Sequence, residues 1–204
     1  MVDRAGTVPP PNIGHRPGTD RASTGHPDLR PEGAVKVPAN AGRGPRLILL
    51  CGLPGSGKTT LAKRLAHETP AVRLCPDEWL ADLGIDAFDE QARARLERRL
   101  SRHAQDLLQL GQSVILEFGF WSRSERNEKR LEARALGVSV ELHYLSAPLD
   151  ELCRRLDARN GAAERGTVPI SREMLEHYAE LFEAPSPAEL ALFDDPFRGK
   201  TGSG

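Results

Sequence analysis

The sequence predicts an α/β fold built on a parallel sheet that helices flank. Short, continuous apolar runs alternate along the chain with longer segments in which leucine and alanine recur at helical spacing. Strands that alternate with helices are typical of parallel sheets with right-handed crossovers. The chain contains no internal repeat, so a single such sheet is expected.

The compact domain is expected over residues 46–197. Before Arg46 the chain is crowded with Pro, Gly, Thr, Asn and Arg and holds hardly any apolar pairs. Residues 1–45 are expected to be disordered, because they cannot bury enough apolar surface to offset their ordering entropy. No apolar stretch of signal-peptide length follows the start. Residues 198–204 are small and polar, and we expect them to fray.

Charge and cysteine content narrow the class of protein. The 28 Lys and Arg and 29 Asp and Glu leave a net charge of −1, which argues against bulk electrostatic attraction to nucleic acid or an acidic membrane, and duplex nucleic acid is not expected as a partner. No run of 18 apolar residues exists that would span a bilayer. Cys51, Cys75 and Cys153 form no CxxC pair and are expected to be reduced and buried. A cytoplasmic location is the default expectation, and no pattern indicates an oligomeric state.

The first elements are punctuated by glycine and proline. The continuous apolar run Arg46–Cys51 is closed by a glycine and predicts a strand buried on both faces. A helix is expected from Thr59 to Glu68, because apolar residues fall on one of its faces and Pro70 stops it. A second short strand over 71–75 and a short helix over Glu78–Leu83 follow.

The remaining elements repeat this pattern. Apolar residues recur at helical spacing over 89–110, and Gly111 provides the stop. The apolar run after Ser113 predicts a third strand that ends at Glu117. The later elements are expected as a helix over 122–136, a strand over 138–145, a helix over 148–159, a Gly/Ala-rich loop over 160–168 and a helix over 171–183.

A phosphate-binding P-loop lies between the first strand and the first helix. Its glycines permit the dihedral angles that turn backbone N–H groups toward a phosphate. Lys58 is expected to reach the β- and γ-phosphates of ATP or GTP, and Thr59 to offer its hydroxyl to Mg²⁺. The strand before the loop and the amphipathic helix after it supply the context that this motif requires. The predicted nucleotide-binding residues are Gly52, Leu53, Pro54, Gly55, Ser56, Gly57, Lys58, Thr59 and Thr60.

Two carboxylates follow strands, at the sheet edge where open α/β folds bind their ligands. Asp77 has two interpretations. It accepts the proton of a hydroxyl that attacks the γ-phosphate, or it caps the short helix that begins at Glu78. Glu117 follows the apolar run of the third strand, and an acidic side chain there is hard to explain as part of the hydrophobic core. We therefore expect Glu117 near Mg²⁺ or its water.

Arginines are expected to supply positive charge to the migrating phosphoryl group. Arg155 and Arg159 are four residues apart, hence on one face of a helix that also carries Arg154. They precede the segment Gly161–Gly166, which has the composition of a mobile lid. The alternative is a solvated face that the nearby acidic residues of the same helix balance.

Further candidates concern the acceptor. Arg123 and Arg126 are expected at the same edge of the sheet, where they are candidates to hold an acceptor or a phosphate. Trp121 either packs or lines the acceptor site, and Trp79 is a further candidate for acceptor binding. The arginine run from Arg93 to Arg102 is interpreted as a solvated face, and the histidines have no metal-ligand spacing.

These motifs together resemble the AAA_33 family of P-loop kinase-like proteins, relatives of polynucleotide kinase, chloramphenicol phosphotransferase, gluconate kinase and zeta toxin. The resemblance covers roughly residues 46–195. It rests on GLPGSGKTT at 52–60, CPDEW at 75–79, LGQSVILEFGFWSRSER at 110–126, LCRRLDARN at 152–160 and, more loosely, FEAPSPAEL at 182–190.

The resemblance implies a nucleoside-monophosphate-kinase-like fold with about five parallel strands and a small lid. It also implies that Asp77 is the base for the acceptor hydroxyl and that Arg155 and Arg159 are the lid arginines. Glu117 departs from the family pattern, because many relatives have Asp there and Glu is one methylene longer.

The function expected from the sequence is an ATP-dependent kinase that uses Mg²⁺ and transfers the γ-phosphate to a hydroxyl of a small-molecule or nucleotide-type acceptor. Two alternatives stay open: an NTP-hydrolysing switch that controls a partner, and a zeta-toxin-like kinase of a sugar nucleotide. The absence of an Asn-Lys-x-Asp stretch argues against a GTPase. The chain is also too short for the second helical subdomain of a ring-forming motor.

Overall fold

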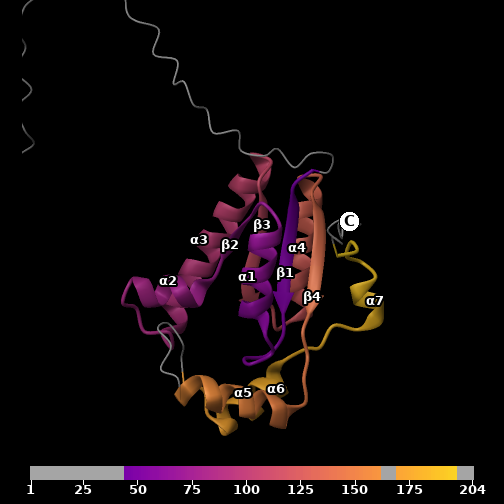
Figure 1. Ribbon diagram of the computed structural model, residues 1–204. Coiled ribbons are helices and arrows are strands. Elements are labelled where there is room, and N and C mark those ends of the chain that lie inside the picture. Colours follow the sequence, from indigo (N-terminus) through magenta and orange to yellow (C-terminus); the bar gives the residue numbers. More distant parts are fainter. Residues whose placement is uncertain (1–43, 162–168, 197–204) are drawn as a thin grey trace, which may run out of the picture. The chain divides into compact units, whose positions relative to one another are not determined.

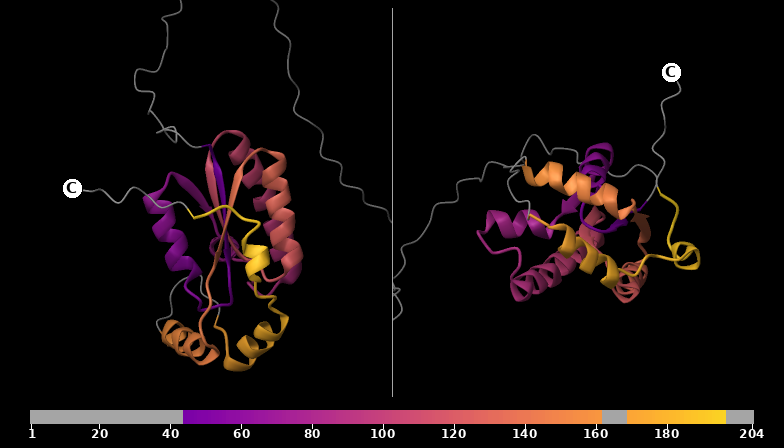
Figure 2. Two further views of the ribbon diagram at one scale, coloured as in Figure 1. Left: turned by 90° about the vertical axis from the view of Figure 1, so that its right-hand side faces the viewer. Right: turned by 90° about the horizontal axis from the view of Figure 1, so that it is seen from below.

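The computed structural model describes residues 44–161 and 169–196, which form a four-stranded parallel sheet with helices on both faces (Figures 1 and 2). The strands are β1 (Arg46–Cys51), β2 (Ala71–Leu74), β3 (Ser113–Gly119) and β4 (Ser139–Tyr144). The helices are α1 (Lys58–Glu68), α2 (Pro76–Asp82), α3 (Glu90–Gln109), α4 (Arg123–Ala135), α5 (Leu149–Gly161), α6 (Arg172–Leu181) and α7 (Pro187–Leu190). None of these helices is long and apolar enough to cross a membrane. Apart from residues 44 and 45, the segments 1–45 and 198–204 lie outside the described residues.

The strand order is β2-β3-β1-β4, and every neighbouring pair is parallel, which confirms the predicted sheet. The sheet has four strands in the described residues, where about five were expected. On the outer side of β4, the N–H of Asp194 donates to the carbonyl of Val140 (2.8 Å), and Asp194 Oδ2 accepts from the N–H of Val140 (2.6 Å). Asp194 thus supplies hydrogen-bond partners for the backbone N–H and carbonyl of Val140 at the sheet edge, where no fifth strand lies among the described residues.

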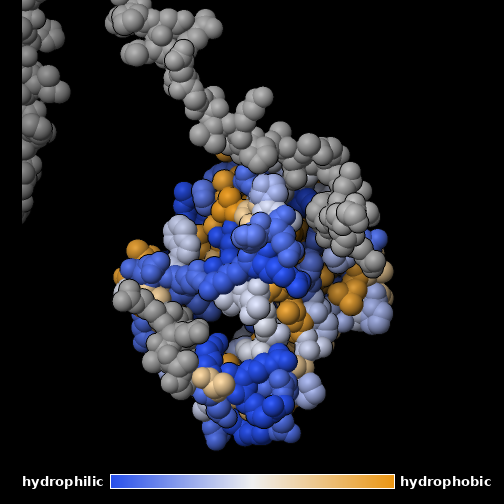
Figure 3. Space-filling view, in the orientation of Figure 1, coloured by the Kyte–Doolittle hydropathy of each residue, from blue (hydrophilic) through white to orange (hydrophobic). Residues whose placement is uncertain are grey.

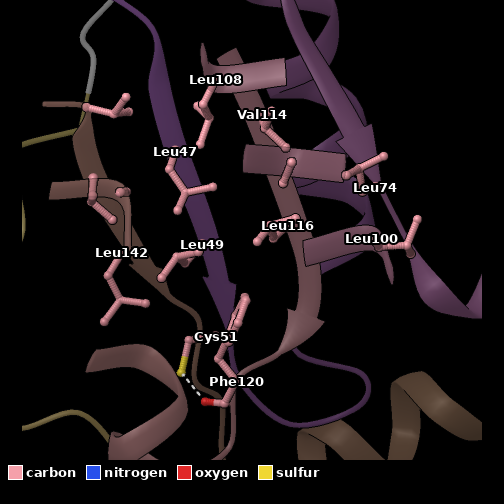
Figure 4. Packing of buried hydrophobic residues seen from close by; sticks show 14 residues of the cluster. Leu47, Leu49, Cys51, Leu74, Leu100, Leu108, Val114, Leu116, Phe120 and Leu142 are labelled. Carbon is pink, nitrogen blue, oxygen red and sulfur yellow. Dashed lines mark hydrogen bonds between the residues drawn. The ribbon is translucent and has the colours of Figure 1, made fainter. Parts of the chain in front are cut away.

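The central strand β1 is buried on both faces. Leu47, Leu49 and Cys51 point to the side that α3 and α4 cover, within the larger hydrophobic cluster (Figure 4). Ile48 and Leu50 point to the opposite side, against α1. A strand covered on both sides needs apolar residues at consecutive positions, which explains the continuous apolar run in the sequence.

Helices α5 and α6 form a separate layer at the carboxyl-terminal edge of the sheet, at the bottom of Figure 1. Leu152 and Leu156 of α5 pack with Leu175 of α6, and Leu53 of the P-loop packs against this cluster. A Cβ added to Gly55 would lie 3.1 Å from the carbonyl oxygen of Leu152. The layer therefore lies directly against the P-loop.

The predicted bounds of the expected helices and strands agree with the structure to within two residues, and one further helix was not expected. Helix α2 begins at Pro76, two residues before the expected start, and its N-cap is Cys75. Proline suits this position because the first helical N–H has no intrahelical partner. Helix α7 was not expected; Ser186 caps it by accepting from the N–H of Glu189 (3.2 Å).

All three cysteines are buried, as the sequence predicted. Burial raises the pKa of Cys51 to about 11 and that of Cys75 to about 12. Both thiols are consequently protonated at neutral pH and poor nucleophiles.

A fully buried arginine fastens α7 to the end of β3. Arg126 of α4 pairs with Glu189 of α7 through Nε–Oε1 (2.6 Å) and Nη2–Oε2 (3.0 Å). Its Nη1 donates to the carbonyl of Phe120 (3.0 Å), whose backbone has a positive φ of 47°. A phenylalanine in this region costs about 1–2 kcal/mol. The buried pair therefore helps to hold a strained turn beside the P-loop.

Replacing Arg126 by methionine is expected to destabilise the domain by about 3 kcal/mol, because Glu189 would remain buried without its partner. Thermal and urea unfolding would measure the loss. The double variant Arg126→Met/Glu189→Leu removes both charges and is expected to recover most of the stability. Equal stability of the single variant and the parent would contradict this account.

Candidate active site

The P-loop connects β1 to α1 and depends on three glycines with positive φ: Gly52 (146°), Gly55 (78°) and Gly57 (98°). The N–H of Gly52 donates to the carbonyl of Gly119 at the end of β3 (3.1 Å). A Cβ at Gly52 would lie 2.3 Å from the carbonyl oxygen of Leu145, which follows β4. The loop is thus tied to the ends of both strands that flank β1.

Replacing Gly52 by alanine is expected to lower stability and nucleotide affinity together, since the added Cβ collides with a backbone atom. Gly137→Ala is the matched control: its φ is also positive (70°), but no atom lies within 4 Å of the added Cβ. The control should cost only about 1 kcal/mol of backbone strain. Equal melting temperatures and equal ATP affinities of the two variants would refute the close approach at Gly52.

Lys58, the first residue of α1, is folded onto the loop. Its Nζ donates to the carbonyls of Gly52 (2.8 Å) and Leu53 (2.9 Å). Burial lowers the pKa of the Lys58 ammonium, while the carboxylates of Glu117 and Asp77 raise it in part. The lysine therefore sits among loop carbonyls with two acidic residues nearby.

The residues of the loop fit a bound phosphate. The Ser56 hydroxyl is buried and has no hydrogen-bond partner among the described residues. No side chain caps the amino terminus of α1, whose N-cap is Gly57, so its first N–H groups remain for an anion. Thr60 is exposed in the first turn of this helix.

Thr59 and Glu117 meet beside the loop. The Thr59 hydroxyl donates to Glu117 Oε1. Glu117 Oε2 accepts from Nε of Arg73 on β2 (2.7 Å), and the same guanidinium forms two hydrogen bonds with Glu78 (2.7 and 2.9 Å). A hydroxyl and a carboxylate oxygen are ligands that suit Mg²⁺. Thr59 and Glu117 are therefore the residues that would hold a magnesium ion beside the loop.

Asp77 lies in the first turn of α2, one residue after Pro76, and α2 has no side-chain cap. The alternative that Asp77 caps a helix is therefore wrong. Its Oδ1 accepts from Nη2 of Arg93 on α3 (2.5 Å), and Arg93 also contacts Glu97 (3.4 Å). The Asp77 side chain is half-exposed, and so is the side chain of Trp79, two residues further along α2.

The arginines of α5 lie on the other side of the P-loop. Arg155 Nη1 donates to the carbonyl of Gly55 (3.4 Å), and its Nε donates to Glu151 (2.7 Å). The positive charge of Arg159 is close enough to lower the pKa of Lys58. Arg154 is exposed and pairs with Glu151. The predicted lid loop lies outside the described residues except for Gly161.

The three acceptor candidates that follow β3 lie in different environments. The prediction that Arg126 faces the sheet edge is wrong, because its side chain is fully buried against Glu189. Trp121 packs on Tyr178 of α6, with 4.9 Å between ring centroids. Arg123 borders a hollow of about 500 Å³ between α4 and the segment that contains α7.

Sequence reasoning missed Arg73 and Arg93, which pair with the carboxylates of Glu117 and Asp77. It also missed Glu78, which pairs with Arg73. The signal for Arg73 was a cation inside the short strand Ala71–Leu74, where an unpaired charge would be costly. Burial is the largest single effect and lowers the pKa of Arg73. The hydrogen bonds with Glu78 and the charge of Glu117 together outweigh it, so the pKa lies above its usual value. Arg93 carried no such signal, since it lies within a run of arginines on a helix.

Lys58, Thr59, Glu117 and Asp77 gather at the carboxyl-terminal edge of the sheet, with α5 facing them. In Figure 3 the surface is hollowed between α5 and the part of the molecule above it. Among the described residues, no group of three or more His, Cys, Asp or Glu side chains forms a metal site. The P-loop side of this arrangement can bind a nucleotide, and the Asp77 carboxylate on the other side can accept a proton.

Comparisons with known proteins agree with this arrangement. A family model described as an AAA domain, AAA_33, matches residues 47–185, more than half of the chain. A curated relative, described as a probable adenylyl-sulfate kinase of Aeropyrum pernix, is 32% identical over 115 residues. The match spans 53% of this chain and 63% of that relative.

Solved structures share the fold. A gluconokinase from Sinorhizobium meliloti 1021 is similar with a TM-score of 0.51 and 20% identity, over 71% of this chain and 79% of that one. Kti12 of Chaetomium thermophilum, in complex with ADP-AlF3, gives a TM-score of 0.54 and 22% identity, over 70% and 82%. A chain of the Pnkp1/Rnl/Hen1 RNA repair complex gives a TM-score of 0.59 and 22% identity, over 70% of this chain and 45% of that chain. At these identities the likeness confirms the P-loop kinase-like fold.

Proposed function

The chain belongs to the AAA_33 family, and on that premise we propose that it is an ATP-dependent phosphotransferase whose acceptor is a hydroxyl group. The observation that carries the proposal is the meeting of Lys58, the Thr59–Glu117 pair and Asp77 at one edge of the sheet. The names of similar proteins, among them a probable adenylyl-sulfate kinase and a gluconokinase, support a kinase.

The donor half of the site is the P-loop. The N–H groups of the loop and of the first turn of α1 bind the phosphates of ATP, and Ser56 supplies a further hydroxyl. Lys58 leaves the carbonyls of Gly52 and Leu53 and pairs with the β- and γ-phosphates. Thr59 and Glu117 would hold Mg²⁺, which would neutralise charge on the phosphates.

The acceptor half is built around Asp77. Its carboxylate takes the proton of the acceptor hydroxyl while that oxygen forms a bond to the γ-phosphorus. The bond between the γ-phosphorus and the bridging oxygen breaks, and ADP leaves with that electron pair. Arg93 orients the carboxylate through Oδ1, which leaves Oδ2 without a hydrogen bond from a described residue.

Charge on the transferred phosphoryl group is stabilised from α5. Arg155 lies within 3.4 Å of the Gly55 carbonyl, at the turn of the P-loop, and Arg159 acts on Lys58 from the same helical face. The attraction between these arginines and the equatorial oxygens of the transferred phosphoryl group strengthens as negative charge develops on those oxygens in the transition state. A cytoplasmic location, a small-molecule or nucleotide-type acceptor and the absence of duplex binding remain predictions.

A screen with labelled ATP and Mg²⁺ tests the proposal. Hydroxylated metabolites, antibiotics, sugar nucleotides and 5′-hydroxyl oligonucleotides would be offered in turn, and label on the acceptor is the expected result. A sugar nucleotide as the sole acceptor would favour the zeta-toxin-like alternative. Release of phosphate to water with every acceptor would overturn the transferase and favour an NTP-hydrolysing switch.

A further inference from the structure

The hollow between α4 and the segment that contains α7 has a volume of about 500 Å³. Helix α7 lies beside α4 (Figure 2), and the buried pair of Arg126 and Glu189 fastens the two helices together. Small-molecule sites typically have volumes of about 300–1,000 Å³, so the hollow has the size of such a site. Neither the P-loop nor Asp77 is among the described residues that line it, and it is therefore separate from the proposed active site.

One side of the hollow is formed by α4 and carries unpaired arginines. Arg123, Asn127 and Arg130 line it and follow the spacing i, i+4, i+7, which brings side chains to one face of a helix. The next arginine on this face, Arg134, pairs with Asp194 (2.9 Å). In the described part of the chain, neither Arg123 nor Arg130 forms such an ion pair.

Several hydrogen-bond donors on this side lack an acceptor. Arg130 Nη2 donates to Asn127 Oδ1 (2.7 Å), which leaves the amide nitrogen of Asn127 to donate elsewhere. Arg130 Nε is buried and has no hydrogen-bond partner among the described residues, which is costly for a buried N–H group. Ser124, which also lines the hollow, adds a hydroxyl that shares a hydrogen bond with Ser122 (2.9 Å). An anion in the hollow would supply acceptors for these donors.

Two carboxylates also line the hollow, and neither reverses its charge. Both oxygens of Glu189 accept from the buried guanidinium of Arg126 (2.6 and 3.0 Å), so these two charges cancel. Glu183 Oε2 accepts from the backbone N–H of Arg123 (2.8 Å). The guanidiniums of Arg123 and Arg130 therefore outnumber the one remaining carboxylate, and the hollow has an excess of positive charge.

The other side of the hollow is partly apolar. Leu192 and Phe193, which follow α7, line it. Leu192 is 45% exposed, and Phe193 is partly buried. Apolar side chains that face a few polar groups across a hollow suit a molecule with an apolar or planar body better than they suit a bare ion.

We propose that this hollow binds a small phosphorylated molecule with an apolar or planar body. The two guanidiniums, the Asn127 amide and the Ser124 hydroxyl offer more donors than the two oxygens of a carboxylate can accept, whereas a phosphate group has three terminal oxygens. Guanidinium groups also match the geometry of phosphate oxygens. This site goes beyond the proposed function, because its lining residues take no part in phosphoryl transfer.

A titration with 4-fluorophenyl phosphate, followed by ¹⁹F NMR, tests the site. The full chain is first saturated with Mg²⁺ and a non-hydrolysable ATP analogue, so that the P-loop is occupied. A probe of this size is expected to bind with a Kd on the order of 1 mM. Arg123→Gln/Arg130→Gln should weaken its binding by about 10- to 100-fold, because two charge-assisted hydrogen-bonding groups are lost.

The matched control is Arg98→Gln/Arg102→Gln, which removes the same charge from two exposed residues of α3 that do not line the hollow. The control should bind the probe like the parent, and both variants should melt close to the parental temperature when no probe is present. Arg123→Gln alone should weaken binding about tenfold and serves if the double variant is unstable. Equal affinity in all the proteins, or equal losses in the two double variants, would overturn the site.

Two further measurements can contradict the proposal. Inorganic phosphate should displace the probe, and 4-fluorobenzoate should bind several-fold more weakly; equal binding of the benzoate would refute the preference for phosphate. Displacement of the probe by the ATP analogue would assign the probe to the P-loop and refute a separate site.

Discussion

Replacing Lys58 by alanine is expected to reduce phosphoryl transfer by at least about 100-fold and to weaken ATP binding strongly. The reason is electrostatic: the ammonium is the one cation that the P-loop itself carries, and removing a preorganised positive group from a site of charge development typically costs about 10²–10³ in rate. Titration calorimetry with ATP and a labelled-phosphate assay would measure the two losses separately.

Lys58 also stabilises the empty loop through the carbonyls of Gly52 and Leu53, so folding must be checked by circular dichroism and thermal unfolding. Arg64→Ala is the control, because it removes a cation from the exposed side of the same helix. The control should bind ATP like the parent. Unchanged ATP affinity and turnover in a folded Lys58→Ala protein would sink the assignment of the P-loop as the nucleotide site.

Replacing Asp77 by asparagine is expected to lower the rate of transfer by about 10²–10⁴-fold while ATP affinity stays close to that of the parent. Asparagine preserves the shape of the side chain and an oxygen that accepts from Arg93, but it cannot take up the proton of a hydroxyl. Single-turnover transfer to the acceptor found in the screen, together with ATP titration, provides the measurement.

Asp82→Asn is the matched control, since Asp82 ends the same helix and is exposed. It should transfer phosphate at the parental rate. Loss of transfer in both variants, or unfolding of Asp77→Asn without a selective loss, would assign Asp77 a part in the structure of α2 instead of in proton transfer.

Much of the fold could be predicted because the relevant forces act locally. The buried strand Arg46–Cys51 is visible as an apolar run, and Gly57 with Lys58 marks the passage from loop to helix. Glu117 could be anticipated beside Thr59 because parallel strands end at one edge of a sheet. The number of strands could not be predicted, because Asp194 hydrogen-bonds Val140 at the edge of the sheet although the two residues are 54 positions apart in the sequence.

The roles of single charged residues were predicted less well. Arg126 looks like Arg123 in the sequence, yet one is buried with Glu189 and the other lies at the surface. Arg93 is one of several arginines on α3, and only the packing of α2 against α3 brings it to Asp77. Which arginine finds an acidic partner depends on residues distant in sequence, so no local pattern distinguishes them.

By itself, the sequence determined the order of the elements, the P-loop between β1 and α1, and the candidates for its phosphate and metal contacts. These features follow from the periodicity of apolar side chains and from the backbone freedom of glycine, which act within a few residues. The tertiary structure alone decided the partners of the charged groups, such as Arg73 with Glu117 and Arg93 with Asp77. Burial and pairing of charge depend on distances across the fold, and these exist only once the helices have packed on the sheet.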